Sequence, residues 1–136
     1  MALFMLDTNM CSYILRGTSS VARRKLMALE EDEIACISAI TEGEIRYGLA
    51  RRSSTALYAA IEGFLAKIQV LPWGRDEATV YGQVRAKQER AGRPLGNMDM
   101  LIAAHAISSG AVLVTRDRAF AQVEGLGGVV NWATDL

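Results

Sequence analysis

Leu3-Phe4-Met5-Leu6-Asp7-Thr8-Asn9, near the start of the chain, is a short apolar run that ends in three polar residues. An apolar run of this kind, followed at once by polar residues, is typical of a strand buried on both faces and then a loop. Similar runs recur, and we predict strands at Leu3–Leu6, Ile34–Ile37, Ile68–Leu71, Ala111–Val114 and Val129–Trp132. Strands buried on both faces belong to parallel sheets, so this stretch indicates an α/β fold.

Segments with helical spacing and helix-start residues lie between these strands. We predict a helical turn at Tyr13–Leu15 closed by Gly17, and helices from Ser20 to Leu29, from Ser38 or Thr41 to Leu49, from Thr55 to Lys67, from Asp76 to Ala91 and from Met98 to Ser108. Alternating strands and helices imply right-handed crossovers and a sheet covered on both faces. The sequence therefore predicts a single α/β domain over residues 1–136, with a parallel sheet of four to five short strands flanked by helices.

Composition excludes several classes of protein. The chain has 136 residues, 51% of them hydrophobic and only two of them proline, so disordered and low-complexity classes are excluded. Fifteen Lys and Arg balance fifteen Asp and Glu, which excludes a simple polycationic nucleic-acid binder but not an enzyme acting on nucleic acid. Cys11 and Cys36 lack metal-ligand spacing and the density of a disulfide scaffold. Without a signal-peptide pattern or an apolar run of roughly 18 residues, we expect a cytoplasmic protein with no membrane segment.

Four acidic residues stand where an open α/β sheet binds ligands, beyond the carboxyl ends of its strands. Asp7 ends the first predicted strand, Glu44 lies one helical turn past the second, Asp117 follows the fourth, and Asp99 opens the helix that precedes the fourth. Two unit charges 4 Å apart repel by about 4 kcal/mol at an effective dielectric of 20, so gathered carboxylates must take up protons, move apart or bind cations. Oxygen ligands favour a hard cation, Mg²⁺ or in its place Mn²⁺.

The basic residues supply a second argument. With those four acids set aside, eleven acidic residues remain against fifteen basic ones, of which twelve are arginine. Arginine is suited to bidentate contacts with phosphate, and Arg46, Arg85, Arg93 and Arg116 are our candidate contacts with RNA. An acidic pocket surrounded by arginine predicts metal-assisted attack of water on a phosphodiester.

Purely structural roles remain open for each of these acids. Thr41-Glu42-Gly43-Glu44 matches a capping box, in which Glu44 would only close the first turn of a helix. Asp7, Asp99 and Asp117 could each simply begin a turn or a helix. The single histidine, His105, lies among apolar residues and is more typical of a core or interface histidine than of a catalytic one.

Four stretches together resemble the motifs of PIN-domain ribonucleases of the VapC toxin type. They are Phe4-Met5-Leu6-Asp7-Thr8-Asn9, Ser38-Ala39-Ile40-Thr41-Glu42-Gly43-Glu44-Ile45-Arg46-Tyr47-Gly48, Asp99-Met100-Leu101-Ile102-Ala103-Ala104-His105-Ala106, and Leu113-Val114-Thr115-Arg116-Asp117 with Phe120. The match covers nearly the whole chain, in the order and at the spacing of the family. The resemblance implies a PIN-like fold and a Mg²⁺-dependent endoribonuclease.

The resemblance also implies a set of site residues. Asp7, Glu44, Asp99 and Asp117 would be the catalytic and metal-binding acids, with Asn9 and Thr115 as polar supports near the metal. Glu42 falls where the family is often apolar, and Arg116 stands where it commonly has asparagine. The expected products carry 5′-phosphate and 3′-hydroxyl ends.

The implied biology is that of the toxin in a type II toxin–antitoxin module. We expect a VapB-type antitoxin as partner, a homodimer, and contact with operator DNA only indirectly through the antitoxin. The stretch from Ala60 to Leu65 and on to Gln83–Ala86 resembles an enteric subgroup that cuts initiator tRNA in its anticodon stem-loop, which makes tRNA the expected RNA substrate. We expect the antitoxin to inhibit by inserting an arginine or lysine among the four acids.

Two other classes of function remain for comparison. A non-catalytic RNA- or protein-binding module on the same fold is the main alternative, and it predicts binding without metal-dependent turnover. Receiver domains need a pair of acids after the first strand, and dehalogenase-type phosphatases need Asp-x-Asp there. Asp7-Thr8-Asn9 contains one acid, which disfavours both.

Overall fold

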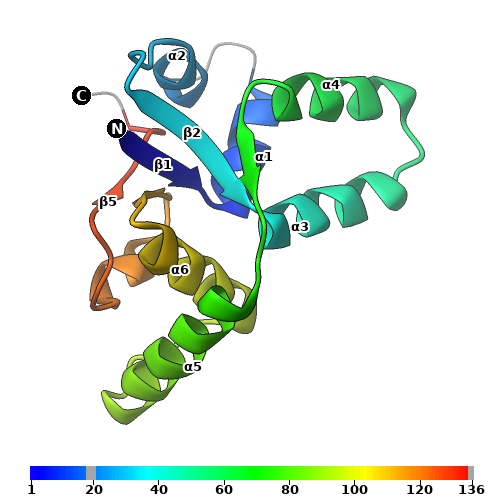
Figure 1. Ribbon diagram of the computed structural model, residues 1–136. Coiled ribbons are helices and arrows are strands. Elements are labelled where there is room, and N and C mark those ends of the chain that lie inside the picture. The colour runs from blue at the N-terminus through cyan, green and yellow to red at the C-terminus, as the bar shows by residue number, and fades with distance from the viewer. Residues whose placement is uncertain (18–20, 135–136) are drawn as a thin grey trace.

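The computed structural model describes residues 1–17 and 21–134, which form a five-stranded parallel sheet between two layers of helices (Figure 1). The strands pair in the order β3-β2-β1-β4-β5. They are β1 (Ala2–Leu6), β2 (Glu33–Ser38), β3 (Gln69–Leu71), β4 (Val112–Val114) and β5 (Val129–Val130). The predicted α/β fold with a parallel sheet is confirmed, with strand ends that differ by one or two residues.

Six α-helices and one 3₁₀-helix are present in the described residues. They are α1 (Thr8–Arg16), α2 (Val21–Met27), α3 (Ala39–Ala50), α4 (Thr55–Leu65), α5 (Arg75–Arg90), α6 (Asn97–Ser109) and η1 (Arg118–Gln122). Among the described residues, none of these helices is long and apolar enough to cross a membrane.

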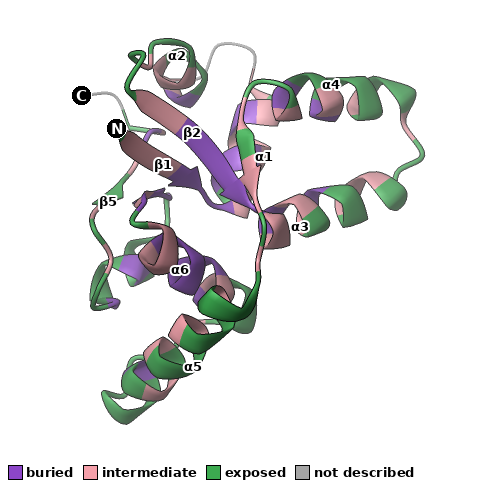
Figure 2. Cartoon of the chain, viewed as in Figure 1, coloured by how far each residue is buried: buried purple, intermediate pink, exposed green. Residues whose placement is uncertain are grey.

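Alternation along the strands builds a separate apolar core on each face of the sheet. Leu6, Ile37 and Val114 belong to one core with residues of α1, α2, α3 and α4, whereas their strand neighbours Met5 and Leu113 belong to the other with residues of α6 and η1. Figure 2 shows this burial as a purple band through β1, β2 and α6, while the outer α5 is mostly exposed. Both faces are covered because successive side chains of a strand point to opposite sides of the sheet.

The predicted starts of α1 and α5 are wrong, whereas for α3 the structure confirms one of the two predicted caps; hydrogen bonds to backbone amides explain each outcome. Helix α1 is a full helix from Thr8 rather than a turn at Tyr13–Leu15, because Asp7 accepts a hydrogen bond from the Met10 amide and begins the helix at once. Helix α3 begins after Ser38, whose Oγ accepts from the Ile40 amide at 3.1 Å. Thr41, the other predicted cap, is buried inside that helix.

The start of α5 also differs from the prediction. Gly74 precedes the helix, and the Glu77 carboxylate accepts from the Gly74 amide at 2.8 Å, so Asp76 does not cap it. Helix α2 ends at Met27 rather than Leu29. Its predicted starting residue, Ser20, lies outside the described residues.

The strand order places the site where the chain changes direction across the sheet. After β1 the chain adds β2 and β3 on one side, then returns to add β4 and β5 on the other. The carboxyl ends of β1 and β4 therefore border the topological switch point, where open α/β sheets bind ligands. The connection from α6 to β4 is short because Gly110, with a φ of 72°, ends the helix in the left-handed conformation.

Candidate active site

Asp7 is fixed at the carboxyl end of β1 by two hydrogen bonds. One carboxylate oxygen accepts from the Met10 amide at 2.8 Å, and the other accepts from the Thr115 hydroxyl at 2.6 Å. The residue is only 3% exposed. Burial raises the pKa of Asp7 above its ordinary value and the charges of Asp117 and Glu44 add to the rise, while the two hydrogen bonds oppose it. Asp7 therefore caps α1 and also carries an ionisable group among other acids.

Glu44 lies on the first turns of α3, beyond the end of β2. Its Oε1 accepts a hydrogen bond from the Thr8 hydroxyl of α1, and that hydroxyl also lies 3.5 Å from the Thr41 hydroxyl. The capping-box interpretation of Thr41 and Glu44 is wrong, because Ser38 caps α3 and Glu44 contacts a different helix. The contact orients Glu44 toward α1, whose start is set by Asp7.

Asp99 lies in the first turn of α6 and is partly buried. Burial is the main cause of its raised pKa, and the charges of Asp117, Asp7 and Glu44 raise it further. Its carboxylate makes no recorded hydrogen bond within the described part of the chain. Asp99 is thus the member of the set whose charge is least stabilised by the protein.

Asp117 stands in the loop after β4 and is exposed. Its backbone amide donates to the Thr115 hydroxyl at 3.0 Å, and its Oδ1 accepts from the Ala119 amide at 2.9 Å at the start of η1. Thr115 therefore connects the Asp7 carboxylate to the loop that carries Asp117. The other expected polar support, Asn9, is exposed on α1 and lines the groove beside Glu44.

The four acids come together electrostatically, since each of Asp7 and Asp99 has its pKa raised by other members of the set. Within residues 1–17 and 21–134, no three His, Cys, Asp or Glu side chains are placed so that they could together hold a metal ion. Mg²⁺ does not require such a cage, because it commonly binds through one or two carboxylates and keeps several waters. Among the residues that the structure describes, Asp99 receives no hydrogen bond on its carboxylate, and an all-oxygen set of this kind fits that coordination.

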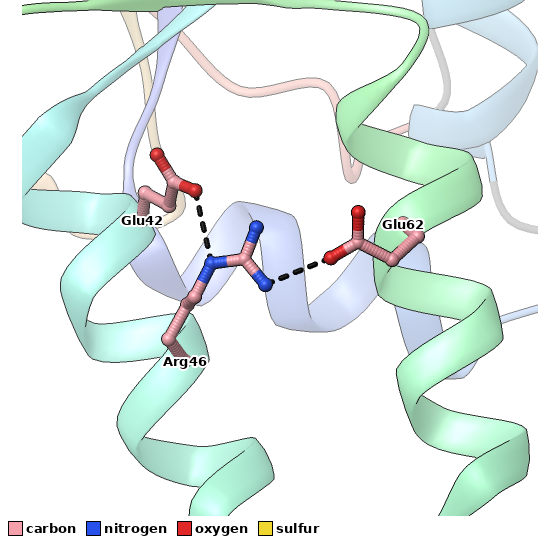
Figure 3. Close-up of polar contacts among 3 residues, drawn as sticks. All are labelled: Glu42, Arg46 and Glu62. Atoms are coloured by element: carbon pink, nitrogen blue, oxygen red, sulfur yellow. Dashed lines mark hydrogen bonds and ion pairs between the residues drawn. The ribbon is translucent and has the colours of Figure 1, made fainter.

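Two of the expected arginine contacts are engaged by carboxylates. Figure 3 shows Arg46 between Glu42 of its own helix and Glu62 of α4, at 3.0 and 2.8 Å. Both carboxylates hold the pKa of Arg46 above its ordinary value, with the Glu62 hydrogen bond the larger cause. Glu42, which the resemblance left without a role, therefore helps to connect α3 to α4. Arg85 is likewise paired, with Glu89 at 3.1 Å.

The other two expected contacts differ in setting. The Arg116 guanidinium lies over the Tyr13 ring of α1, 4.7 Å from its centroid, next to the loop of Asp117. Arg93 is exposed beyond the end of α5, and its backbone carbonyl accepts a hydrogen bond from Gln88. Arg116 is thus beside the carboxylates, while Arg93 lies on the layer formed by α5 and α6.

Sequence reasoning missed residues that hold the acids in place. Thr8 binds Glu44, and its only sequence signal is its position directly after Asp7. A second contact joins the Ser38 hydroxyl to His105 Nδ1 at 2.7 Å, and the two residues are 0% and 1% exposed. His105 is buried, as expected, and its contact ties α6, which carries Asp99, to the start of α3, which carries Glu44.

A groove leads away from the carboxylates between α1, α3 and α4. It encloses about 320 Å³, and its lining includes Thr8, Asn9 and Glu44 at one end and apolar side chains such as Leu49, Leu57 and Ile61 further along. A larger hollow of about 600 Å³ lies at the opposite ends of the strands, near the starts of β2 and β3, and none of the four acids lines it.

Comparison with known proteins places the chain in a family. The PIN domain model matches residues 4–126, and the chain belongs to the PIN-domain family. Within that family its relatives are VapC proteins. It is 39% identical over 125 residues to the tRNA(fMet)-specific endonuclease VapC of Shigella flexneri. The aligned region covers 90% of this chain and 93% of that relative.

Solved structures give the same result for the fold. DNA-bound VapBC from Salmonella typhimurium aligns with a TM-score of 0.85 at 36% identity, over 97% of this chain and 99% of that one. VapBC2 from Rickettsia felis, bound to a promoter DNA fragment, aligns with a TM-score of 0.89 at 29% identity, over 96% of this chain and 98% of that one.

Proposed function

We propose that the chain is an endoribonuclease and the toxin of a VapBC-type toxin–antitoxin module, with Asp7, Glu44, Asp99 and Asp117 as its catalytic acids. The observation that carries the proposal is the electrostatic coupling of these acids beside the switch point of the sheet. The family and the ribonuclease names of its relatives support the same activity.

The proposed reaction is hydrolysis of a phosphodiester. The oxygen of a water molecule bonds to phosphorus, the bond to the 3′ oxygen breaks, and that oxygen takes up a proton, which leaves 5′-phosphate and 3′-hydroxyl ends. A bound Mg²⁺, with Mn²⁺ as its substitute, would supply positive charge to the phosphate oxygens and lower the pKa of a nearby water. The carboxylates would hold the cation, while Thr8 and Thr115 orient Glu44 and Asp7 through the hydrogen bonds described above.

The substrate we propose is tRNA, with the anticodon stem-loop of initiator tRNA as the first candidate. The Shigella flexneri relative is by name a tRNA(fMet)-specific endonuclease, at 39% identity. Arg116 and Arg93 are exposed and available to phosphates. Arg46 and Arg85 would bind phosphate only by exchanging a carboxylate partner, which makes them the weaker contacts of the expected four.

A VapB-type antitoxin is the proposed partner. The Salmonella structure is DNA-bound VapBC and the Rickettsia structure is VapBC2 bound to a promoter DNA fragment, which supports an antitoxin partner for this chain. A homodimer that reaches operator DNA only through the antitoxin is part of the same proposal. The groove between α1, α3 and α4 has the apolar lining that a partner helix needs and ends at Glu44. An arginine or lysine at that end would meet the negative charge of the acids and exclude the metal. Inhibition that survives replacement of every arginine and lysine in the antitoxin's toxin-binding tail would overturn this mechanism.

The test of the nuclease is cleavage of a bulk tRNA pool with Mg²⁺, with Mn²⁺ and with EDTA, using antitoxin-free protein. The matched variant is Asp99→Asn, because the Asp99 carboxylate makes no hydrogen bond within residues 1–17 and 21–134, whereas Asp7→Ala would also remove the cap of α1. We expect discrete fragments that require both the metal and Asp99. The Mg²⁺-induced rise in melting temperature should shrink in the variant, which checks the metal site without activity. Equal cleavage by the variant, or RNA binding without any turnover, would favour the non-catalytic binding module.

A further inference from the structure

One side of α3 continues from Glu44 toward the tip of the hairpin that α3 forms with α4. Glu44, Tyr47 and Arg51 follow at spacings of three and four residues, which aligns them along one side of the helix. Tyr47 is 64% exposed, and the Arg51 guanidinium carbon lies 5.3 Å from the centroid of its ring. We name these two residues the Tyr47–Arg51 face. At a rise of about 1.5 Å per residue, Arg51 lies roughly 10 Å from Glu44 along the helix, the length of about three stacked nucleotides.

The charge of the hairpin tip suits a polyanion. Between Arg46 and Glu62 the sequence contains Arg51 and Arg52 and no acidic residue. In the described part of the chain, neither Arg51 nor Arg52 forms an ion pair. The charged residues on either side of this segment, Arg46 and Glu62, pair with each other. A phosphate can therefore approach Arg51 without displacing a carboxylate.

The composition of the tip favours RNA over a protein partner. The large hydrophobic side chain that α3 exposes here is Tyr47, and neither α3 nor α4 exposes a large aliphatic side chain. A protein interface needs an apolar centre depleted in charge. Sites for single-stranded nucleic acid instead combine arginine with aromatic rings on which bases stack.

We propose that the Tyr47–Arg51 face binds the RNA strand that leads into the carboxylates, with a base stacked on Tyr47 and a phosphate bound by Arg51. This rests on the proposed function, because it assumes that RNA is the substrate. It assigns the strand a path along α3, and it gives the hairpin tip a role in affinity that is separate from the chemistry at the acids.

The experiment is a fluorescence-anisotropy titration of a fluorescein-labelled tRNA pool in EDTA. Tyr47→Ala should weaken binding about tenfold through the lost stack, while Tyr47→Phe keeps the ring and should bind like wild type. Arg51→Ala should reduce the steepness of the log–log salt dependence of binding by about 0.7, the contribution of one phosphate contact. The matched controls are Tyr58→Ala, an exposed tyrosine off this face, and Arg75→Ala on α5, and both should bind like wild type.

The outcomes separate this inference from the proposed function. The expected pattern of binding in a protein that cleaves no RNA would support the face and overturn the nuclease. Cleavage by wild type together with unchanged RNA affinity in Tyr47→Ala and Arg51→Ala would overturn the face alone. A change in oligomeric state or antitoxin affinity, with RNA affinity unchanged, would show that the surface contacts protein, and would also overturn the proposal.

Discussion

At the scale of single residues, the site depends on groups that are costly to bury. Asp7 and Asp99 both have pKa values raised mainly by burial, and no donor in the described part of the chain offsets that cost at Asp99. Burying such charged groups reduces the free energy of unfolding. Groups of this kind are typical of functional sites, where the reaction needs them despite their cost to stability. The two following predictions test this cost and the support around it.

Asp99→Asn should stabilise the protein at neutral pH. The folded pKa of Asp99 lies above the ordinary value of 3.8, so the folded state disfavours the ionised form and loses stability as pH rises through the raised pKa. The gain in the free energy of unfolding should be absent below pH 3.8 and should grow as pH rises above it through the raised pKa, as urea denaturation at several pH values would show. A variant less stable than wild type at pH 7.5 would contradict the account.

Ser38→Ala should lower the free energy of unfolding by more than the loss of a helix cap alone. Ser38 caps α3 and also bonds His105, whose pKa is lowered by burial so that the ring is neutral at pH 7. Losing the cap costs about 1 kcal/mol, and leaving a buried ring nitrogen without its partner adds ~1–3 kcal/mol. The matched control is Ser54→Ala, which removes the cap of α4 alone. Equal free energies of unfolding in the two variants would contradict a supporting role for the Ser38–His105 contact.

At the scale of elements, backbone conformation decides which glycines can be replaced. Gly82 is exposed within α5 and an added Cβ would meet nothing within 4 Å, so Gly82→Ala should stabilise by about 0.5–1 kcal/mol. Gly110 also has open space but has a φ of 72°, so Gly110→Ala should destabilise by roughly 1–2 kcal/mol. Urea denaturation of both variants checks the opposite signs, and the same sign for both would contradict the argument.

At the scale of the whole molecule, the two buried cysteines report on the two cores separately. Cys11 belongs to one core and Cys36 to the other, and both are 0% exposed. Burial raises the pKa of Cys36 to about 11 and that of Cys11 well above its ordinary value, so both thiols stay protonated and unreactive at pH 8.

In Cys11→Ala and Cys36→Ala, the remaining thiol should react with Ellman's reagent only as fast as the protein unfolds. If the sheet holds both layers together, both thiols become accessible in the same unfolding event. The two single-cysteine variants should then give the same unfolding rate, once each rate is corrected for the stability of its variant. Rapid labelling of either native variant would contradict the burial argument, and a large difference between them would show that one layer opens alone.

The sequence by itself determined the layered fold, and it singled out four acids as the candidate site. Apolar runs such as Leu3–Leu6 require burial on both faces, and the rule for parallel sheets brings the ends of β1 and β4 to one edge. Those inferences needed only local patterns. The structure differs from the prediction mainly at the starts of α1 and α5, which Asp7 and Glu77 set through hydrogen bonds.

Only the tertiary structure decided what each side chain contacts. Arg46, a candidate RNA contact, also bridges Glu42 and Glu62, because folding brings α4 beside α3 across a turn that sequence spacing does not reveal. Thr8 reaches Glu44 and Ser38 reaches His105 over separations of 36 and 67 residues. Contacts of that range depend on how whole helices pack, so no local pattern encodes them, and they orient acids that the sequence had proposed as candidates.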